Sequence, residues 1–406
     1  MSKDNKRQFK PTILTLVALL LSSMLILMGG AAVAPALPDI TAFFAGESSF
    51  LISLIITLPS LSVAIFGFAV GILADKLGKV KVLVISLLIF TIAGVAGFFM
   101  DHLGTLLAFR FILGIGIAGI TSTVTALIAE YYTGVSRTKV LSYQSAAMGI
   151  GVLVLEFTGG SLAEVSWREP FLIYLIGLPI LIMVVLSMRE PVIEAPTDDI
   201  KRMERVQARP INKGFVVMCY VAIIVVMMMV MLLPTQIPYY LEGIGVSSSL
   251  VGLFLGAHGI ANACVSIAYR QVSQRFNPFF ILGCGFVVMA IGLILIMLSD
   301  SVALAVAMLI IVGVGVGMSV PPIANILAGE VTNSNSGKIM GGYGTCLSFG
   351  QFLISILSVP LLSIVGDSIP ALFAIMAGVA FVSGLLILVW YKSGGEKRSR
   401  AKYAAQ

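Results

Sequence analysis

The chain has 406 residues, of which 59% are hydrophobic and only 11% are charged, and its formal net charge is +6. Soluble domains carry roughly 25% charged residues, so this composition excludes a water-soluble fold and requires a lipid bilayer around the chain. The apolar runs are continuous and longer than about twenty residues, which matches helices that cross the hydrocarbon core. Barrel strands would instead alternate apolar and polar residues. The composition therefore predicts an all-α membrane protein.

Twelve membrane-spanning helices are predicted, separated by short polar turns. Their expected ranges are 12–34, 48–72, 79–100, 103–128, 139–163, 169–188, 213–234, 248–270, 277–299, 302–327, 338–365 and 369–391. The four cysteines lie within these apolar runs and lack the paired spacing of metal ligands or of a disulfide framework. We expect them to be small buried hydrophobic residues.

Lysine and arginine are distributed unevenly along the predicted spans. If the N-terminus lies in the cytoplasm, all 25 basic residues except Arg110 and Arg168 fall on the inner side. Because basic residues accumulate on the cytoplasmic side of membrane proteins, we expect both termini to lie inside a prokaryotic cell membrane. Topology and anionic lipid then explain the net positive charge, and no nucleic-acid partner is expected.

A shift of 199 residues aligns the two halves of the sequence. The coincident pairs are Pro35 with Pro234, Lys76 with Arg275, Gly114 with Gly313, Gly116 with Gly315, Lys139 with Lys338 and Gly151 with Gly350. The prolines are expected to end the first helix of each half. Parallel repeats of this kind are typical of secondary transporters. We therefore predict two pseudo-symmetric six-helix bundles, 1–188 and 213–391, with a cytoplasmic linker over 189–212 and a basic cytoplasmic tail over 392–406.

The turn between the second and third spans carries the most specific motif. It reads Gly71-Ile-Leu-Ala-Asp75-Lys76-Leu-Gly78-Lys79-Val-Lys81. The lysines fit an ordinary positive-inside turn, but topology does not explain the acid at Asp75. A carboxylate here could cap the N-terminus of a neighbouring helix and latch one conformation.

This loop, with its spacing G-x-L-A-D-x-x-G-x-x-K, is similar to the signature loop of the major facilitator superfamily. The resemblance extends over the whole chain, through the twelve spans, the halves of about 200 residues and the central linker. It implies two bundles around a central cavity, lined mainly by spans one, four, seven and ten. It also implies that Asp75 latches against the eleventh span, whose N-terminus is expected near 336–338. The second copy of the loop, 273–277, lacks the acid and the glycine.

The fourth span contains an arginine in apolar sequence. Its pattern, Leu106-x-x-x-Arg110-x-x-x-Gly114-x-Gly116-x-Ala118, is similar to the second motif of the drug:proton antiporter branch of that superfamily. An arginine so deep in a span is costly and must face a cavity or a partner, and a purely structural ion pair is the alternative. The glycines are better explained by close helix packing than by dinucleotide binding, because no strand precedes them.

The fifth span contains the only acid deep in a predicted helix, Glu156. The antiporter branch has a third motif here, and this chain keeps Gly151, Gly159 and Gly160 but has Leu-Glu in place of Gly-Pro. The departure weakens the resemblance to exporters. It also creates a carboxyl group that is costly to ionise in apolar surroundings and is therefore a natural proton carrier.

Two partners for Glu156 are within reach of the predicted topology. Arg110 and Glu156 lie about seven residues inside their outer helix ends, so at a similar depth of ~10 Å. His258, in the eighth span, lies slightly deeper, and the resemblance places spans five and eight opposite each other. Glu156 and His258 could pair across the halves. Alternatively, His258 is a core histidine that is hydrogen-bonded to Asn262 or to backbone.

Other polar side chains within spans are candidates for the substrate cavity or for helix–helix hydrogen bonds. They are Gln144, Asn262, Asn325 and Gln351.

The sequence shows no nucleotide-binding P-loop and no metal-ligand cluster. We expect no cofactor and no enzymatic activity, and energy must then come from an ion gradient. The leading hypothesis is a monomeric proton-coupled antiporter that exports small, partly apolar molecules, with Glu156 taking the proton and Arg110 and His258 setting its affinity. The alternatives are proton-coupled uptake of a small metabolite and, more remotely, a membrane sensor that does not transport.

Overall fold

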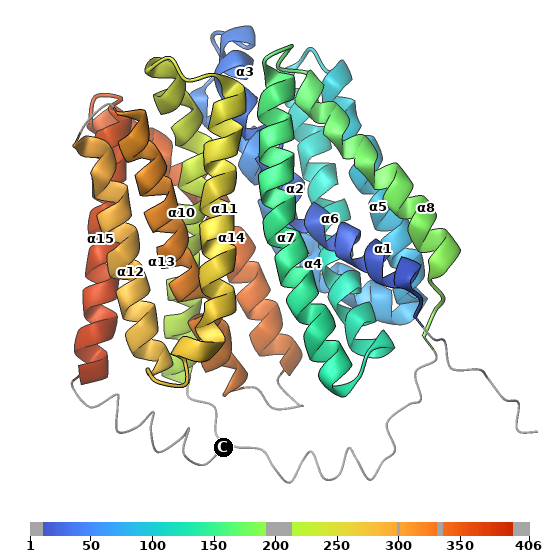
Figure 1. Cartoon of the computed structure of the whole chain (residues 1–406). Coiled ribbons are helices and arrows are strands. Elements are labelled where there is room, and N and C mark those ends of the chain that lie inside the picture. The colour runs from blue at the N-terminus through green and yellow to red at the C-terminus, as the bar shows by residue number, and fades with distance from the viewer. Residues whose placement is uncertain (1–10, 192–212, 299–300, 331–335, 393–406) are drawn as a thin grey trace, which may run out of the picture.

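The computed structural model describes residues 11–191, 213–298, 301–330 and 336–392 (Figure 1). In these ranges all regular structure is helical, and twelve segments are long and apolar enough to cross a membrane. The predicted all-α membrane fold with twelve spans is therefore confirmed. The basic tail beyond Lys392 and most of the predicted linker lie outside the described residues.

The first half of the chain contributes six spans. The first span consists of α1 (Ile13–Met24), α2 (Met28–Ala31) and α3 (Leu37–Phe43). The next four spans are α4 (Ser49–Leu77), α5 (Lys79–Ala96), α6 (Leu103–Tyr131) and α7 (Gly134–Ala163). The sixth span consists of a 3-10 segment (Glu169–Ile176) and α8 (Gly177–Ser187). The second half contributes α10 (Lys213–Gly243), α11 (Ser248–Val272), α12 (Pro278–Ile294), α13 (Val302–Ala328), α14 (Ser336–Ile364) and α15 (Ile369–Trp390).

The helices of each half form their own group, blue to green for the first half and yellow-green to red for the second (Figure 1). Two pairs of helices join the groups. In one pair α4 packs against α14, and in the other α7 packs against α11, near the centre of the view. We refer to these contacts as the α4–α14 seam and the α7–α11 seam.

Glycine packing reproduces the 199-residue repeat in space. A Cβ atom added to Gly114 would lie 2.3 Å from the carbonyl oxygen of Pro59, and one added to Gly313 would lie 2.4 Å from the carbonyl oxygen of His258. Pro59 and His258 are themselves 199 residues apart. The same relation holds for Gly116 and Gly315, which fit against equivalent turns of the third span of each half. Each half therefore needs glycine at the same close helix crossing.

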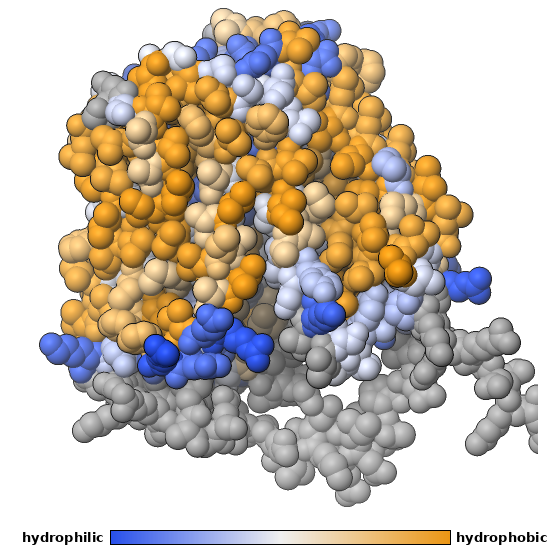
Figure 2. All heavy atoms as spheres, in the orientation of Figure 1, coloured by the Kyte–Doolittle hydropathy of each residue, from blue (hydrophilic) through white to orange (hydrophobic). Residues whose placement is uncertain are grey.

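Hydrophobic side chains cover the middle height of the molecule, and hydrophilic ones gather at its two ends (Figure 2). Apart from Arg110 and Arg168, the described lysines and arginines all lie at or beyond the helix ends on one side. We call this side the basic end and the opposite side the acidic end. The acidic end carries Asp39, Glu47, Asp101, Glu164, Glu169, Glu242 and Asp367.

The expectation that Pro35 and Pro234 end their helices was wrong. The first span continues to Phe43 through short 3-10 turns, and α10 runs through Pro234 and Pro238 to Gly243. Neighbouring helices in a membrane bundle can supply partners for the backbone groups that a proline frees, so the helix need not stop. The spans therefore reach nine residues further toward the acidic end than the apolar runs indicated.

Candidate functional site

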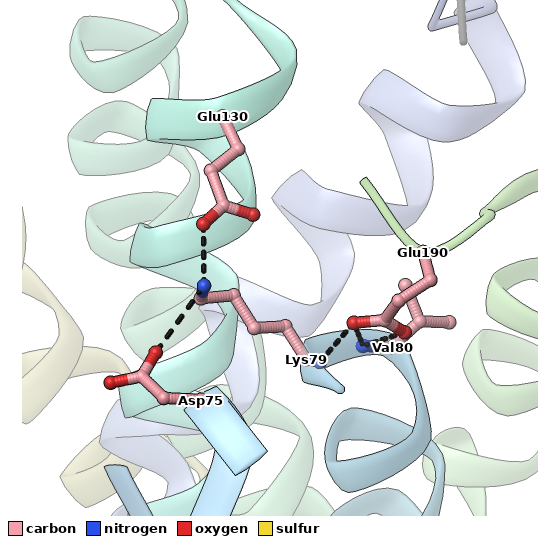
Figure 3. A network of polar contacts seen from close by, with 5 residues as sticks. All are labelled: Asp75, Lys79, Val80, Glu130 and Glu190. Carbon is pink, nitrogen blue, oxygen red and sulfur yellow. Dashed lines mark hydrogen bonds and ion pairs between the residues drawn. The ribbon is translucent and has the colours of Figure 1, made fainter. Parts of the chain in front are cut away.

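The signature loop forms a polar network at the basic end (Figure 3). The ammonium group of Lys79, at the start of α5, makes an ion pair with Glu130 of α6 and lies 3.3 Å from the carboxylate of Asp75 on α4. Glu190, just after α8, accepts hydrogen bonds from the backbone N–H groups of Lys79 and Val80. The network thus joins the basic ends of four spans within the first half.

Gly78 is required at this turn for two reasons. Its φ of 104° is in the left-handed region, which side chains other than glycine rarely adopt. In addition, a Cβ atom there would lie 2.7 Å from the carboxyl carbon of Glu190. Gly71 has no such need, because a Cβ atom would lie 4.0 Å from the Ser122 hydroxyl. The other two lysines of the motif, Lys76 and Lys81, are exposed.

The described partner of Asp75 is Lys79, in the same half, and the Asp75 side chain is 71% exposed. The side chains of residues 336–337, at the N-terminus of α14, lie outside the described part of the structure. A latch between Asp75 and α14 therefore stays a prediction.

Arg110 of α6 is fully buried among aromatic rings and backbone. Its Nη1 donates to the Tyr174 hydroxyl at 2.7 Å and to the carbonyl oxygen of Gly29 at 3.4 Å. The guanidinium carbon lies 4.5 Å from the ring centre of Phe171 and 5.1 Å from that of Tyr174. Among the described residues no carboxylate pairs with Arg110, and Nη2 has no hydrogen-bond partner.

Arg110 and Tyr174 act on the irregular part of the first span. Between α1 and α3 the chain passes through 3-10 turns, which leave carbonyl groups without helical partners. The Tyr174 hydroxyl donates to the carbonyl oxygens of Met28 and Gly29, both at 3.2 Å. Irregular backbone at membrane depth is tolerated only where protein or water satisfies it. Here Arg110 and Tyr174 donate hydrogen bonds to the backbone carbonyl groups of the first span.

Glu156 lies in the α7–α11 seam. The residue is 6% exposed, and its Oε2 is buried without a hydrogen-bond partner in the described structure. A Cβ atom on Gly252 of α11 would lie 2.1 Å from the carbonyl oxygen of Glu156, so the two helices touch through their backbones at this level. The α7–α11 seam therefore holds a buried carboxyl group for which the described residues provide no counter-ion.

His258 is buried within the second half and not in the seam. Its Nδ1 lies 3.3 Å from the carbonyl oxygen of Leu309 on α13, and its own carbonyl group faces Gly313 of the same helix. Of the two alternatives for a core histidine, the structure shows the backbone partner. Across the described ranges, no hydrogen bond or ion pair joins any two of Glu156, Arg110 and His258.

The four polar candidates for the cavity have different surroundings. Gln144 donates to Thr125 at 3.5 Å, and Asn325 donates to the Tyr269 hydroxyl at 2.9 Å, each within one half. Asn262 accepts from Ser266 on its own helix at 3.2 Å. Gln351 accepts from Ser60 at 2.7 Å, and this hydrogen bond crosses the α4–α14 seam.

At the acidic end, two contacts between the halves escaped the sequence analysis. The hydroxyl groups of Thr41 on α3 and Tyr239 on α10 lie 2.8 Å apart. Glu164, after α7, accepts from the backbone N–H of Ser249 in the first turn of α11 at 3.3 Å. The repeat offered a signal for the first pair, because Thr41 and Tyr239 occupy neighbouring repeat positions. Nothing in the sequence distinguished Glu164 from the other acidic residues at this end.

We expect Glu164→Gln to loosen the acidic end of the α7–α11 seam. Hydrogen bonds from the Ser249 and Ser247 hydroxyls and from the Ser249 backbone hold the pKa of the Glu164 carboxyl below its usual value. The contact is therefore complete above the usual glutamate pKa and weakens as the pH on this side falls through the lowered value. Spin labels at Val165 and Leu250 should show a separated population that grows about two- to fivefold in the variant.

Glu47→Gln is the matched control for that measurement, because Glu47 is an exposed acid at the same end but outside the seam. Equal label distances in Glu164→Gln and in the unmodified protein would show that Glu164 does not hold the halves together.

Comparison with known proteins identifies one protein family over most of the chain. The model of the Major Facilitator Superfamily matches residues 19–278 and 218–405. Quinolone resistance protein NorA of Staphylococcus aureus (strain MSSA476) is 23% identical over 339 residues, which cover 83% of this chain and 84% of NorA. Niacin transporter NiaP of Acinetobacter baylyi is 32% identical over 136 residues, 32% of this chain and 30% of that protein.

Solved structures with the same fold include transporters of different substrates. A crystal structure of a D-xylose–proton symporter has a TM-score of 0.74 at 16% identity, covering 92% of this chain and 96% of that one. A POT family transporter in complex with 5-aminolevulinic acid has a TM-score of 0.75 at 13% identity, covering 93% and 96%. At these identities the likeness establishes the fold alone.

Proposed function

The chain belongs to the Major Facilitator Superfamily, and from this premise we propose that it exports small, partly apolar molecules in exchange for protons. Members of this family are secondary transporters in membranes and not enzymes, and their substrates are small molecules. We further propose that the basic end faces the cytoplasm of a prokaryotic cell, that both termini lie there, and that the protein acts as a monomer.

Similarity to NorA supports export over uptake. It extends over 83% of this chain, and the name of that protein describes resistance to quinolones. Resistance to a compound follows naturally when a membrane protein removes it from the cell. The low identity does not carry the substrate over, so we propose a class of substrate and not a compound.

The burial of Glu156 between the halves is the observation that carries proton coupling. A buried carboxylate without a hydrogen-bond donor or a counter-ion is strongly disfavoured, so we propose that Glu156 is neutral while this seam is closed. If the halves separate along α7 and α11, water reaches the group and it can exchange its proton. We propose that substrate binding from the basic end loosens this seam, so that Glu156 releases its proton to that side as the substrate is bound. Proton exchange at Glu156 is then tied to the movement of the halves.

The other two proposed coupling residues have different roles in this picture. Arg110 holds the irregular part of the first span and therefore acts on the shape of the first half. His258 connects α11 to α13 and acts on the second half. We propose that both influence coupling through the position of helices, while Glu156 carries the proton.

The Glu164 and Thr41 contacts close the acidic end, and a recess opens between the halves toward the basic end in Figure 2. With the basic end in the cytoplasm, this recess faces the interior of the cell. An exporter in this state is ready to receive substrate from the cytoplasm.

Proton-coupled uptake is the second candidate. The Leu-Glu pair at 155–156 departs from the motif of the antiporter branch, and proton symporters share the fold. The two functions differ in whether substrate moves against the direction of the protons or with it, and this difference can be measured without further assumptions about the site.

Transport in membrane vesicles decides between them. The substrate is first selected as a small molecule that raises the melting temperature of the purified protein. Inside-out vesicles with an acidic lumen should accumulate this compound, because protons leaving the lumen drive it inward. Accumulation only in right-side-out vesicles with an acidic exterior would establish uptake, and indifference to both gradients would remove proton coupling.

A further inference from the structure

The two seams between the halves are related by the 199-residue repeat, so every position in one has a counterpart in the other. The shift takes Thr57 to Gly256 and Ser355 to Glu156, and likewise takes Ser60 to Gly259 and Gln351 to Val152. The packing agrees with this correspondence. Ser60 is hydrogen-bonded to Gln351, and a Cβ atom on Gly259 would lie 2.9 Å from Cγ1 of Val152.

The α4–α14 seam is joined by polar side chains from both halves. The hydroxyl groups of Thr57 and Ser355 lie 2.6 Å apart, and both residues are buried. One turn away, the Ser60 hydroxyl donates to Gln351 at 2.7 Å. Buried Ser355 and half-buried Gln351 on α14 therefore each have a hydrogen-bond partner on α4.

On its α11 side, the α7–α11 seam has glycines where the α4–α14 seam has serine and threonine. Serine or threonine at positions 53, 57 and 60 of α4 is replaced in α11 by Gly252, Gly256 and Gly259. A Cβ atom on Gly256 would lie 2.9 Å from the Cα atom of Leu153, so the backbones touch here as they do at Gly252. These glycines bring the helices together and provide no side-chain donor.

Glu156 occupies the position that corresponds to Ser355. Ser355 has a hydroxyl partner across its seam, whereas the counterpart of that partner is Gly256. The repeat therefore pairs Glu156, whose Oε2 has no hydrogen-bond partner in the described structure, with a glycine that has no side-chain donor.

We propose that Gly252 and Gly256 are positioning residues for Glu156, which keep its carboxyl group buried and without a donor from the opposite half. Closure of the α7–α11 seam then selects the neutral carboxyl, and ionisation of Glu156 opposes closure. This inference rests on the proposed function only for the role of Glu156 as proton carrier.

Other titratable groups on the elements packed against α7 do not interfere with this arrangement. Near the depth of Glu156 they are His258 on α11, Arg110 on α6 and Tyr174 in the segment before α8. His258 is bound to Leu309 O, and Arg110 and Tyr174 are bound to each other and to the first span.

Gly256→Ser and Gly256→Ala form the matched pair that tests the proposal. Both add the same Cβ atom, but only serine restores a hydroxyl group at the counterpart of Thr57. The readout is the infrared absorption of a protonated carboxyl group as a function of pH, assigned to Glu156 by its absence in Glu156→Gln. This readout reports the Glu156 proton directly, so it remains informative even if transport turns out not to depend on Glu156.

We expect the midpoint of this titration to lie about 1–2 pH units lower in Gly256→Ser than in Gly256→Ala, because a hydrogen bond to the carboxylate favours its charged form. Equal midpoints in the two variants would overturn the proposal. So would a Glu156 that is ionised near pH 7 in the unmodified protein under conditions that keep the acidic end closed.

Two further variants keep the test decisive. If the single variants do not assemble, both are repeated with Leu153→Ala, since the new Cβ atom would lie 2.4 Å from Cδ1 of Leu153. Thr57→Val removes the hydroxyl from the other seam and should leave the Glu156 midpoint unchanged. A shift of the same size in Thr57→Val would mean that any disturbance between the halves moves the titration, and the specific role of Gly256 would be lost.

Discussion

Glu156→Gln should abolish proton-driven accumulation of substrate and leave the exchange of substrate between two pools intact. Glutamine has nearly the same shape as the protonated acid and cannot release a proton. The seam can therefore still close around residue 156, and the halves can still carry substrate across. What is lost is the link between that movement and the pH gradient.

Both activities are measured in the same proteoliposomes, with and without an imposed gradient. Driven accumulation in the variant should fall to the level seen without a gradient, while counterflow proceeds at a similar rate to that of the unmodified protein. Glu47→Gln, which neutralises an exposed acid at the acidic end, should retain both activities. Undiminished driven transport in Glu156→Gln would assign the proton to another residue.

Arg110→Ala should cost the largest amount of stability among the substitutions considered. It removes a buried cation that donates to Tyr174 and Gly29 and packs on two aromatic rings. The variant leaves a cavity beside the irregular part of the first span and removes a donor from it. We expect a loss of about 3–5 kcal/mol, seen as a lower melting temperature of the purified protein.

Arg110→Lys and Tyr174→Phe separate geometry from charge. Lysine keeps the charge but lacks the planar fork that reaches Tyr174 and stacks on the rings, so it should restore little of the lost stability. Tyr174→Phe keeps the ring and removes one donor to Met28 and Gly29, and should cost about 1–2 kcal/mol. Full stability in Arg110→Lys would show that the charge alone matters.

The fold was predictable because the bilayer imposes strict rules on length and composition. A helix that crosses the hydrocarbon core needs about twenty apolar residues, and each such run in the sequence became a span. The repeat was equally readable, since Gly114 and Gly313 are needed at the same close helix crossing in each half. The ends of spans were less predictable, because α10 continues through two prolines that its neighbours accommodate.

The candidate residues could be selected from the sequence by residue type, but their contacts could not be predicted. An acid and an arginine inside spans were recognised from their cost in lipid. Their partners depend on how the helices are rotated about their axes, which an apolar sequence hardly specifies. Arg110 found its partners on the backbone at Gly29 and on Tyr174. Glu190 caps α5, although the sequence placed it at the start of the linker.

Glu164 shows a different limit. Its carboxylate contacts α11 only because the two halves meet at that end in this conformation. A sequence does not say which conformation of a moving protein is populated. Contacts that depend on which conformation is populated are therefore among the least accessible to sequence reasoning.

The central claim is that Glu156 carries the proton exchanged for substrate. Its most direct test is the pH change of a weakly buffered solution of purified protein when a stabilising compound from the melting screen is added. We expect protons to be released by the unmodified protein and none by Glu156→Gln at the same occupancy of ligand. Equal proton release from both proteins would contradict the claim.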